Sequence, residues 1–128
     1  MAGERTEVKR MQKDSEKVRC EHEERVRLVA KSMPSVEQIE EMASRFKAIS
    51  EPSRLKILLA LSCGELCVEH LTQAVGGNQS AVSHQLKTLK DNKIVKSKRQ
   101  GKQVIYAVSD GHVLTMINVA KEHLGCDE

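Results

Sequence analysis

Residues 79–89 read QSAVSHQLKTL, a stretch whose side chains divide into an apolar set and a polar set at helical spacing. The set predicted to face inward is Ala81, Val82, Leu86 and Leu89. The set predicted to face outward also includes Lys90, the residue that follows this stretch. Its members are Gln79, Ser80, Ser83, His84, Lys87 and Lys90. Asn78 is a favoured N-cap residue, so the spacing predicts an amphipathic helix from Gln79 to about Asp91.

The segment before this helix completes a two-helix motif. Residues 65–74 are expected to form a short helix, and Val75-Gly76-Gly77 supplies a tight turn in which glycine can adopt positive φ. Two short helices joined by a glycine turn, the second with a small and polar outer face, are typical of a helix-turn-helix.

The segment after the helix predicts a β-hairpin. Residues 94–99 and 103–108 have strand character, and Gln100-Gly101-Lys102 forms the turn between them. The tip is basic, and residues 80–102 hold seven Lys and Arg against Asp91 alone. Such a block can be a solvated face, but a basic hairpin directly after the helix indicates a winged helix-turn-helix. We therefore expect the wing to bind DNA phosphates and the outer helix face to meet base edges.

The chain as a whole is expected to divide into an N-terminal arm and one domain. Residues 1–32 carry nine Lys and Arg against seven Asp and Glu, which predicts a flexible or partly helical arm. Residues 33–128 are expected to form the DNA-binding and dimerisation domain. They begin with an amphipathic helix capped by Ser35 and a second, buried helix that starts at Glu51-Pro52-Ser53 and stops near Gly64.

Composition excludes several classes of function. Phe46 and Tyr106 are the only aromatic residues of the 128, so a surface that stacks nucleic-acid bases on several rings is excluded. The longest apolar run, residues 57–61, is far below the ~20 residues of a membrane span. We expect a cytoplasmic protein of mainly α structure with a small β-hairpin and no membrane partner.

A last helix is predicted from Ser109 or Asp110 onward. Its apolar stripe is Val113, Met116, Ile117, Ala120 and Leu124. A winged domain offers no obvious internal groove for this stripe, so the helix is a candidate contact for a homodimer. A two-fold dimer would present two recognition helices to consecutive major grooves.

The same helix carries four potential metal ligands, Asp110, His112, His123 and Cys126. His112 and His123 are eleven positions apart, which returns them to nearly one face but separates them by ~16 Å along the axis. One ion cannot bridge that distance, whereas an antiparallel partner helix would bring Asp110 and His112 opposite His123 and Cys126. The mixed ligands suit Zn(II) best, with Co(II), Ni(II) and Cd(II) as alternatives. The competing interpretation makes Asp110 a helix cap and the other three ordinary surface groups.

A second group of ligands is weaker. Cys67 and His70 are three positions apart on the predicted third helix, and the arm contributes Cys20 and His22, so the four could form an accessory Cys/His site. The simpler interpretation is a half-buried Cys67 and a solvent-facing His70. Cys63 is expected to be a small core residue.

Four stretches now resemble one family: residues 49–58 (ISEPSRLKIL), 65–71 (ELCVEHL), 79–89, and 98–102 (KRQGK) with Tyr106. They are similar to the ArsR/SmtB family of bacterial metal-sensing repressors. The resemblance implies a homodimeric winged helix that leaves its operator when metal binds. It places Gln79, Ser80, Ser83 and His84 at the major groove and Arg99 and Lys102 on the wing.

The resemblance also bears on the metal sites. It matches Asp110, His112 and His123 to three ligands of an interchain zinc site, with Cys126 in a place where the family has Glu or His. Asp127 or Glu128 could serve instead of Cys126. The family's other site uses a Cys-Val-Cys, of which the second thiol is here Glu69, so an arsenic or lead site of three thiolates is not expected.

The resulting hypothesis is an apo homodimeric repressor of metal efflux or resistance genes, released by Zn(II) or a similar divalent ion. The alternative is a thiol- or redox-responsive repressor of the same fold that uses Cys63 or Cys67. An enzyme built on a Cys-His pair is not expected, because no third group that would orient the pair is evident.

Overall fold

The computed structural model describes residues 21–125. The chain divides into two compact units, with the boundary between Gln38 and Ile39. In the first unit, residues 21–32 form a helix with every side chain exposed. Helix α2 (Val36–Ile49) then begins at a capping box, in which Gln38 N donates to Ser35 Oγ at 3.2 Å and Ser35 N donates to Gln38 Oε1 at 3.0 Å. This confirms Ser35 as the predicted cap.

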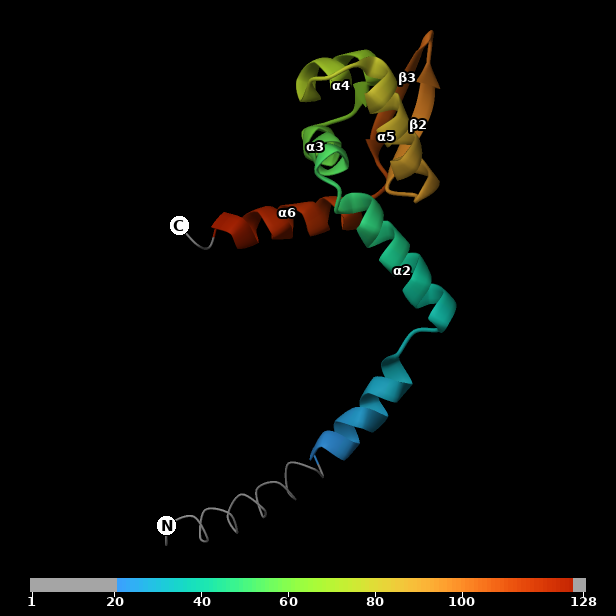
Figure 1. The fold of residues 1–128 in the computed structure, drawn as a ribbon, viewed down its shortest axis with the longest axis vertical. Helices are drawn as coiled ribbons and strands as arrows, with labels where there is room; N and C mark the ends of the chain where they lie inside the picture. Colours follow the sequence, from blue (N-terminus) through green and yellow to red (C-terminus); the bar gives the residue numbers. More distant parts are fainter. Residues whose placement is uncertain (1–20, 126–128) are drawn as a thin grey trace, which may run out of the picture. The chain divides into compact units, whose positions relative to one another are not determined.

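The second unit continues α2 with further helices and a small sheet (Figure 1). In chain order the elements are α3 (Pro52–Leu61), β1 (Leu66–Cys67), α4 (Val68–Val75), α5 (Gln79–Asp91), β2 (Val95–Gln100), β3 (Gln103–Val108) and α6 (Gly111–Gly125). Helices α4 and α5 form the helix-turn-helix, and β2 and β3 form the wing. The predicted fold class, mainly helical with a small antiparallel sheet, is confirmed.

The core lies where α3, α4 and α5 meet the base of the wing. The largest fully buried side chains are Ile57, Leu58, Leu71, Leu86, Leu89 and Ile94. Val113 and Ile117 of α6 are buried in the same cluster, so part of the stripe predicted for dimer contact is in the core of its own chain. No helix among residues 21–125 has the length and apolar content that crossing a membrane requires.

The prediction of a helix over residues 65–74 is wrong at its start. Leu66 and Cys67 are extended and pair with Tyr106 and Ile105 of β3, which gives an antiparallel sheet of order β1-β3-β2. The helix begins only at Val68, because Cys67 is its N-cap. A strand of two residues has no periodicity of its own and exists only through its partner strand, so local sequence could not reveal it.

Two predicted core positions are also wrong. Ala81 and Cys63 are exposed. Of α2 only Ala48 is buried, while Val36, Ile39, Met42 and Phe46 are between 41% and 66% exposed. The apolar spacing of α2 correctly predicted a helix, but most of its apolar face meets no buried layer in the described part of the chain.

Candidate functional site

The recognition helix α5 is positioned by its cap and by the turn before it. Asn78 Oδ1 accepts a hydrogen bond from Ala81 N at 2.8 Å, as predicted for an N-cap. Gly76 and Gly77 have φ of 84° and 88°, a region that favours glycine. Val82, Leu86 and Leu89 then anchor the inner face of α5 in the core.

The outer face of α5 is open to solvent. All six residues predicted to face outward are exposed: Gln79, Ser80, Ser83, His84, Lys87 and Lys90. Lys90 Nζ donates to Ser97 Oγ at 2.7 Å, so the C-terminal turn of α5 is tied to β2. The outer face of α5 therefore lies beside the wing.

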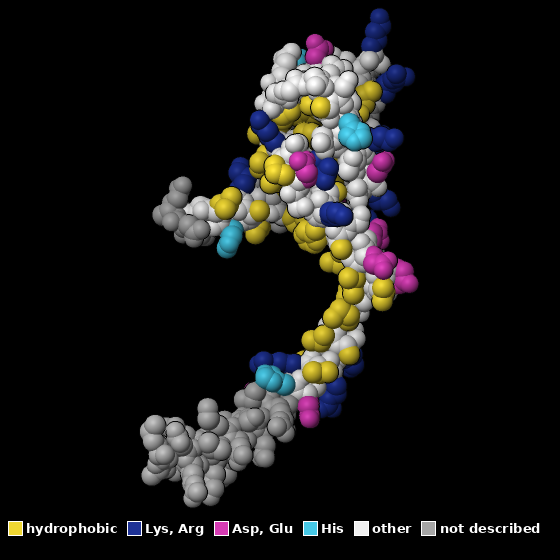
Figure 2. All heavy atoms as spheres, in the orientation of Figure 1, with side chains coloured by type: hydrophobic (Ala, Val, Ile, Leu, Met, Phe, Trp, Pro, Cys, Tyr) yellow, Lys and Arg dark blue, Asp and Glu magenta, His cyan; other side chains and the backbone are white. Residues whose placement is uncertain are grey.

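The wing presents cations at its tip. Gln100 pairs with Gln103, and Gly101 takes a φ of 66°, so the turn between the strands is tight. Arg99 and Lys102 are exposed, and Lys98 Nζ lies 3.4 Å from Glu65 Oε2. Lys and Arg side chains gather along the edge formed by β2, β3 and α5 in Figure 2, so wing and recognition helix form one basic surface.

Sequence reasoning missed one residue of α5. Gln85 is half-buried, and its Oε1 accepts a hydrogen bond from Arg54 Nη1 at 3.1 Å. The two residues lie 31 positions apart. No local pattern links them, and only the packing of α3 against α5 brings them together.

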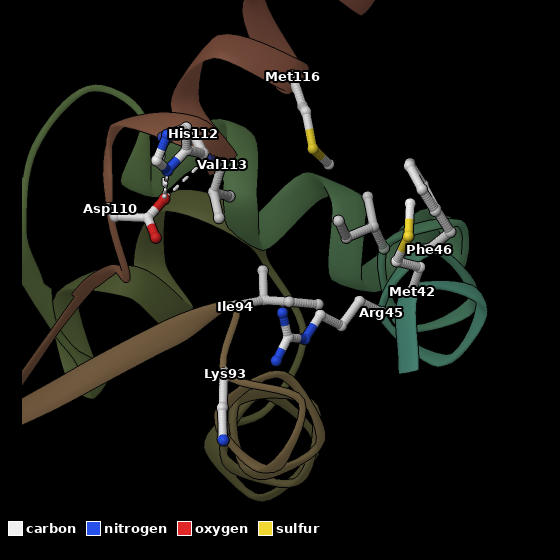
Figure 3. Close-up of a pocket in the computed structure, with 10 residues that line it drawn as sticks. Met42, Arg45, Phe46, Lys93, Ile94, Asp110, His112, Val113 and Met116 are labelled. Atoms are coloured by element: carbon white, nitrogen blue, oxygen red, sulfur yellow. Dashed lines mark hydrogen bonds and ion pairs between the residues drawn. The ribbon is translucent and has the colours of Figure 1, made fainter. Parts of the chain in front are cut away.

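Asp110 and His112 lie side by side at the start of α6 (Figure 3). Asp110 Oδ1 accepts from His112 N at 2.9 Å and from Val113 N at 3.2 Å, and His112 Nδ1 lies 3.5 Å from the same oxygen. The side chain of His112 is 95% exposed. Asp110 thus caps the helix, as the simpler interpretation held, and also carries a carboxylate beside an accessible imidazole.

The cap keeps the carboxylate ionised. The backbone N–H of Val113 is the largest influence that lowers the pKa of Asp110 below its ordinary 3.8, and the N–H and charge of His112 act in the same direction, against a smaller effect of lost hydration. Both backbone hydrogen bonds fall on Oδ1. At neutral pH the carboxylate is therefore charged and able to attract a cation.

A cavity of about 350 Å³ adjoins this pair, between α2 and α6. Its apolar lining includes Met42, Phe46, Val113 and Met116, and its polar lining includes Arg45 and Lys93 (Figure 3). The cavity is thus lined mainly by side chains that α2 and α6 leave partly exposed.

The other predicted ligands do not complete the site within one chain. His123 is exposed in the last turns of α6, eleven positions from His112 and hence ~16 Å along the axis. Cys126 lies outside the described residues. Across residues 21–125, no three His, Cys, Asp or Glu side chains gather at metal-binding distance. One described chain therefore offers a pair of ligands at one end of α6 and a single histidine near the other.

The second group of predicted ligands is only partly assembled. Cys67 Sγ lies 3.3 Å from His70 Nδ1 and accepts from His70 N at 3.5 Å. Cys67 is 4% exposed and is the N-cap of α4, not a member of a longer helix as predicted. His22 is exposed in the first unit, and Cys20 lies outside the described residues.

Comparison with known proteins agrees with this geometry. Residues 51–97 match the family model described as "Bacterial regulatory protein, arsR family". The chain is 41% identical to the Transcriptional repressor SmtB homolog of Synechocystis sp. over 103 residues, which cover 80% of this chain and 78% of the relative. The chain belongs to the ArsR family. Its relationship to the SmtB homolog also confirms the predicted ArsR/SmtB resemblance.

Two further known proteins are similar to this ArsR-family chain, one in sequence and one in structure. It is 34% identical to a Cadmium resistance transcriptional regulatory protein CadC homolog of Staphylococcus aureus, over 88% of this chain and 93% of the relative. The homodimeric winged helix-turn-helix DNA-binding domain Mb0332 of Mycobacterium bovis superposes with a TM-score of 0.64 at 30% identity, covering 73% of this chain and 93% of that domain. The winged helix-turn-helix is confirmed, and the family consists of regulators, not enzymes.

Proposed function

We propose that this chain is a metal-responsive transcriptional repressor, which binds double-stranded operator DNA as an apo homodimer and is released by Zn(II) or by Cd(II), Co(II) or Ni(II). Release would derepress genes of metal efflux or resistance, and the protein would act in the cytoplasm, where bacterial DNA lies. The observation that carries the proposal is the placement of Asp110 beside His112 at one end of α6, with His123 near the other end.

The residues present fit a zinc-type ion. A carboxylate and an imidazole are accessible together at the start of α6, and a second imidazole is accessible near its end. Two antiparallel copies of α6 would pair Asp110 and His112 with the partner's His123 and the partner's Cys126. Oxygen, nitrogen and sulfur ligands of this kind suit Zn(II). When bound, the ion would cross-link the protomers.

The dimer would be built from α6 together with α2. Phe46 is 56% exposed, Met116 40%, Val119 57% and Leu124 74%. Apolar side chains left this open on neighbouring elements are typical of a surface that another protein covers. A second copy of the same chain would cover them under two-fold symmetry, and Mb0332, the related domain, is homodimeric.

The DNA contacts would divide by chemistry. Gln79, Ser80, Ser83 and His84 would meet base edges in the major groove, while Lys87, Arg99 and Lys102 would contact phosphates. Their exposure on one basic surface supports this division. We also propose that residues 1–32 form an arm and that residues 33–128 form the DNA-binding and dimerisation domain.

A second, accessory site would involve Cys67 and His70, with Cys20 and His22 from the arm. The contact between Cys67 Sγ and His70 Nδ1 supports it as an accessory metal site. A thiol-responsive repressor based on Cys63 or Cys67 is not favoured, because the relatives include a protein named for cadmium resistance.

The test is a binding titration with matched histidine variants. Apo protein is added to a fluorescent duplex that carries the DNA upstream of its own coding sequence, and anisotropy is followed as Zn(II), Cd(II), Co(II) or Ni(II) is added. His123→Ala should bind the duplex like the wild type but lose metal-induced release. His70→Ala should retain release, because it alters only the accessory pair. Equal loss of DNA binding and metal response in His123→Ala would contradict the assignment.

A further inference from the structure

Within one chain, helix α2 is attached to α3, α5 and α6 by little apolar burial. Ala48 is its single buried residue, while Ile39, Met42 and Phe46 are 41%, 50% and 56% exposed. Dispersed and exposed apolar contacts do not fix the direction of a helix. Within one chain, directional hydrogen bonds in the C-terminal half of α2 therefore have a large share in setting its orientation relative to α3 and α5.

Arg54 provides the first of these connections. Its Nε donates to Ala48 O at 2.6 Å, and its Nη1 donates to Gln85 Oε1 at 3.1 Å. Ala48 O belongs to the last turn of α2, where carbonyls lack partners within the helix. The guanidinium is planar and rigid, so it fixes the angle between its two acceptors. Through Arg54, the end of α2 is joined to the middle of the recognition helix.

Ser44 provides the second connection. Its Oγ donates to Asn92 Oδ1 at 2.9 Å, and Asn92 Nδ2 donates in turn to Thr88 O at 2.9 Å. Asn92 is the C-cap of α5. Gln85 and Asn92 are seven positions apart, about 10 Å along a helix axis. Two attachment points at that separation restrict the tilt and the rotation of α2 relative to α5.

We propose that Arg54 and Ser44 are positioning residues, which couple the orientation of α2 to that of the recognition helix. The inference rests on the operator binding of the proposed function. Arg54 is half-buried and directs its donors at Ala48 and Gln85, so it acts through α5 and not on DNA. Helix α2 also lines the cavity beside Asp110 and His112, so a displacement of α2 there is passed to the recognition helix by the same two connections.

The experiment compares operator affinity and its salt dependence in the apo protein. Arg54→Lys keeps the positive charge but loses the planar guanidinium that reaches two acceptors at once. We expect it to raise Kd about tenfold, the loss of affinity typical when a hydrogen bond from a charged group is removed. Ser44→Ala should raise Kd about threefold, since its bond is exposed and neutral. The slope of log Kd against log salt should stay unchanged in both, whereas loss of a phosphate contact would lower it by about 0.9.

A double-mutant cycle tests the path through Gln85. Gln85→Met removes the side-chain oxygen of α5 that accepts the hydrogen bond from Arg54. It also tests the proposal by itself if Arg54→Lys does not fold. The rise in Kd caused by Gln85→Met should largely disappear in the Arg54→Lys background, because the hydrogen bond between Arg54 and Gln85 is already lost there. Additive effects of the two substitutions would overturn the proposal.

Controls separate positioning from stability and assembly. Arg27→Lys, in the helix of residues 21–32, and Ser62→Ala, whose hydroxyl bonds Leu59 O on its own helix, should leave Kd unchanged. Folded fraction and dimer content are measured at the assay concentration for every variant. Unchanged Kd in Arg54→Lys and Ser44→Ala, or a reduced salt slope, would overturn this inference alone. A wild-type chain that binds no operator duplex would overturn the proposed function and this inference with it.

Discussion

Lys90 Nζ donates a 2.7 Å hydrogen bond to Ser97 Oγ, and this contact ties the end of the recognition helix to the first strand of the wing. Both surfaces that are proposed to meet DNA are thereby held in one arrangement. Lys90, which was predicted to lie on the outward face of this helix, thus also has a structural partner seven positions along the chain.

Removal of this tie is expected to weaken operator binding slightly. Ser97→Ala deletes the acceptor of this exposed hydrogen bond and loosens the link between the wing and α5, so Kd should rise about twofold to fivefold. Fluorescence anisotropy with the upstream duplex measures the change. Ser109→Ala, whose hydroxyl bonds Lys93 O at 2.6 Å, reports whether any broken link near α5 has the same effect. An unchanged Kd in Ser97→Ala would show that this hydrogen bond contributes nothing to operator binding.

The wing cations should govern salt dependence. Arg99→Gln and Lys102→Gln each remove one positive charge from the tip, and each should reduce the slope of log Kd against log salt by about 0.9 if one phosphate contact is lost. Titrations at several salt concentrations give the slope. Lys47→Gln removes a charge from the last turn of α2 and should leave the slope as it is. Equal reductions in all three variants would point to net charge and not to wing contacts.

Replacement of Lys93, just after the end of α5, is expected to stabilise the fold. Lys93 has a φ of 60°, and the adjoining hydrogen bonds from Lys93 N to Lys90 O and from Ile94 N to Leu89 O, both 2.9 Å, close the helix in the way a glycine usually does. Lys93→Gly should relieve the left-handed strain and raise the free energy of unfolding by about 1 kcal/mol, measured by urea denaturation.

Gly101→Ala is the opposite substitution and serves as its control. Gly101 has a φ of 66°, and a Cβ there would meet no atom within 4 Å, so any loss of stability comes from the backbone alone. We expect a loss of about 1 kcal/mol. If Lys93→Gly were destabilising while Gly101→Ala behaved as expected, contacts of the Lys93 side chain would outweigh its backbone strain.

Acid stability should depend on Glu51, the N-cap of α3. Partial loss of hydration raises the pKa of this carboxyl, but hydrogen bonds from Arg54 N and from Ser53, together with the charge of Arg54, lower it below its ordinary 4.5. The folded chain then binds fewer protons than the unfolded chain, so this contribution is present above pH 4.5 and is lost as pH falls through the folded pKa.

Glu51→Gln keeps an acceptor oxygen for the cap but removes the titrating charge. Its melting temperature should therefore fall less steeply than that of the wild type between pH 5 and pH 3, roughly the range in which a carboxyl of this kind titrates. Thermal denaturation followed by circular dichroism provides the comparison. Parallel pH profiles for the two proteins would show that other carboxylates dominate acid unfolding.

Local signals were sufficient for most elements of the fold. Ser35, Asn78 and the Gly76-Gly77 turn act through atoms within three or four residues of themselves, so their effect can be recognised in the sequence. The same holds for the exposed face of α5, since a helix with three buried positions has a defined opposite side. The position of Asp110 beside His112 follows from their spacing in one helical turn.

Contacts between distant segments were decided by tertiary structure. Strand β1 exists because Leu66 and Cys67 find partners in β3, and Arg54 reaches Gln85 because α3 packs against α5. The apolar residues of α2 remain exposed for the same reason, because periodicity shows which face of a helix is apolar but not what covers it. Local periodicity, caps and turns were enough to predict the helices, the wing and which potential ligands share the last helix. Only the packing decided which of them meet, since the energy of such contacts depends on groups that lie far apart along the chain.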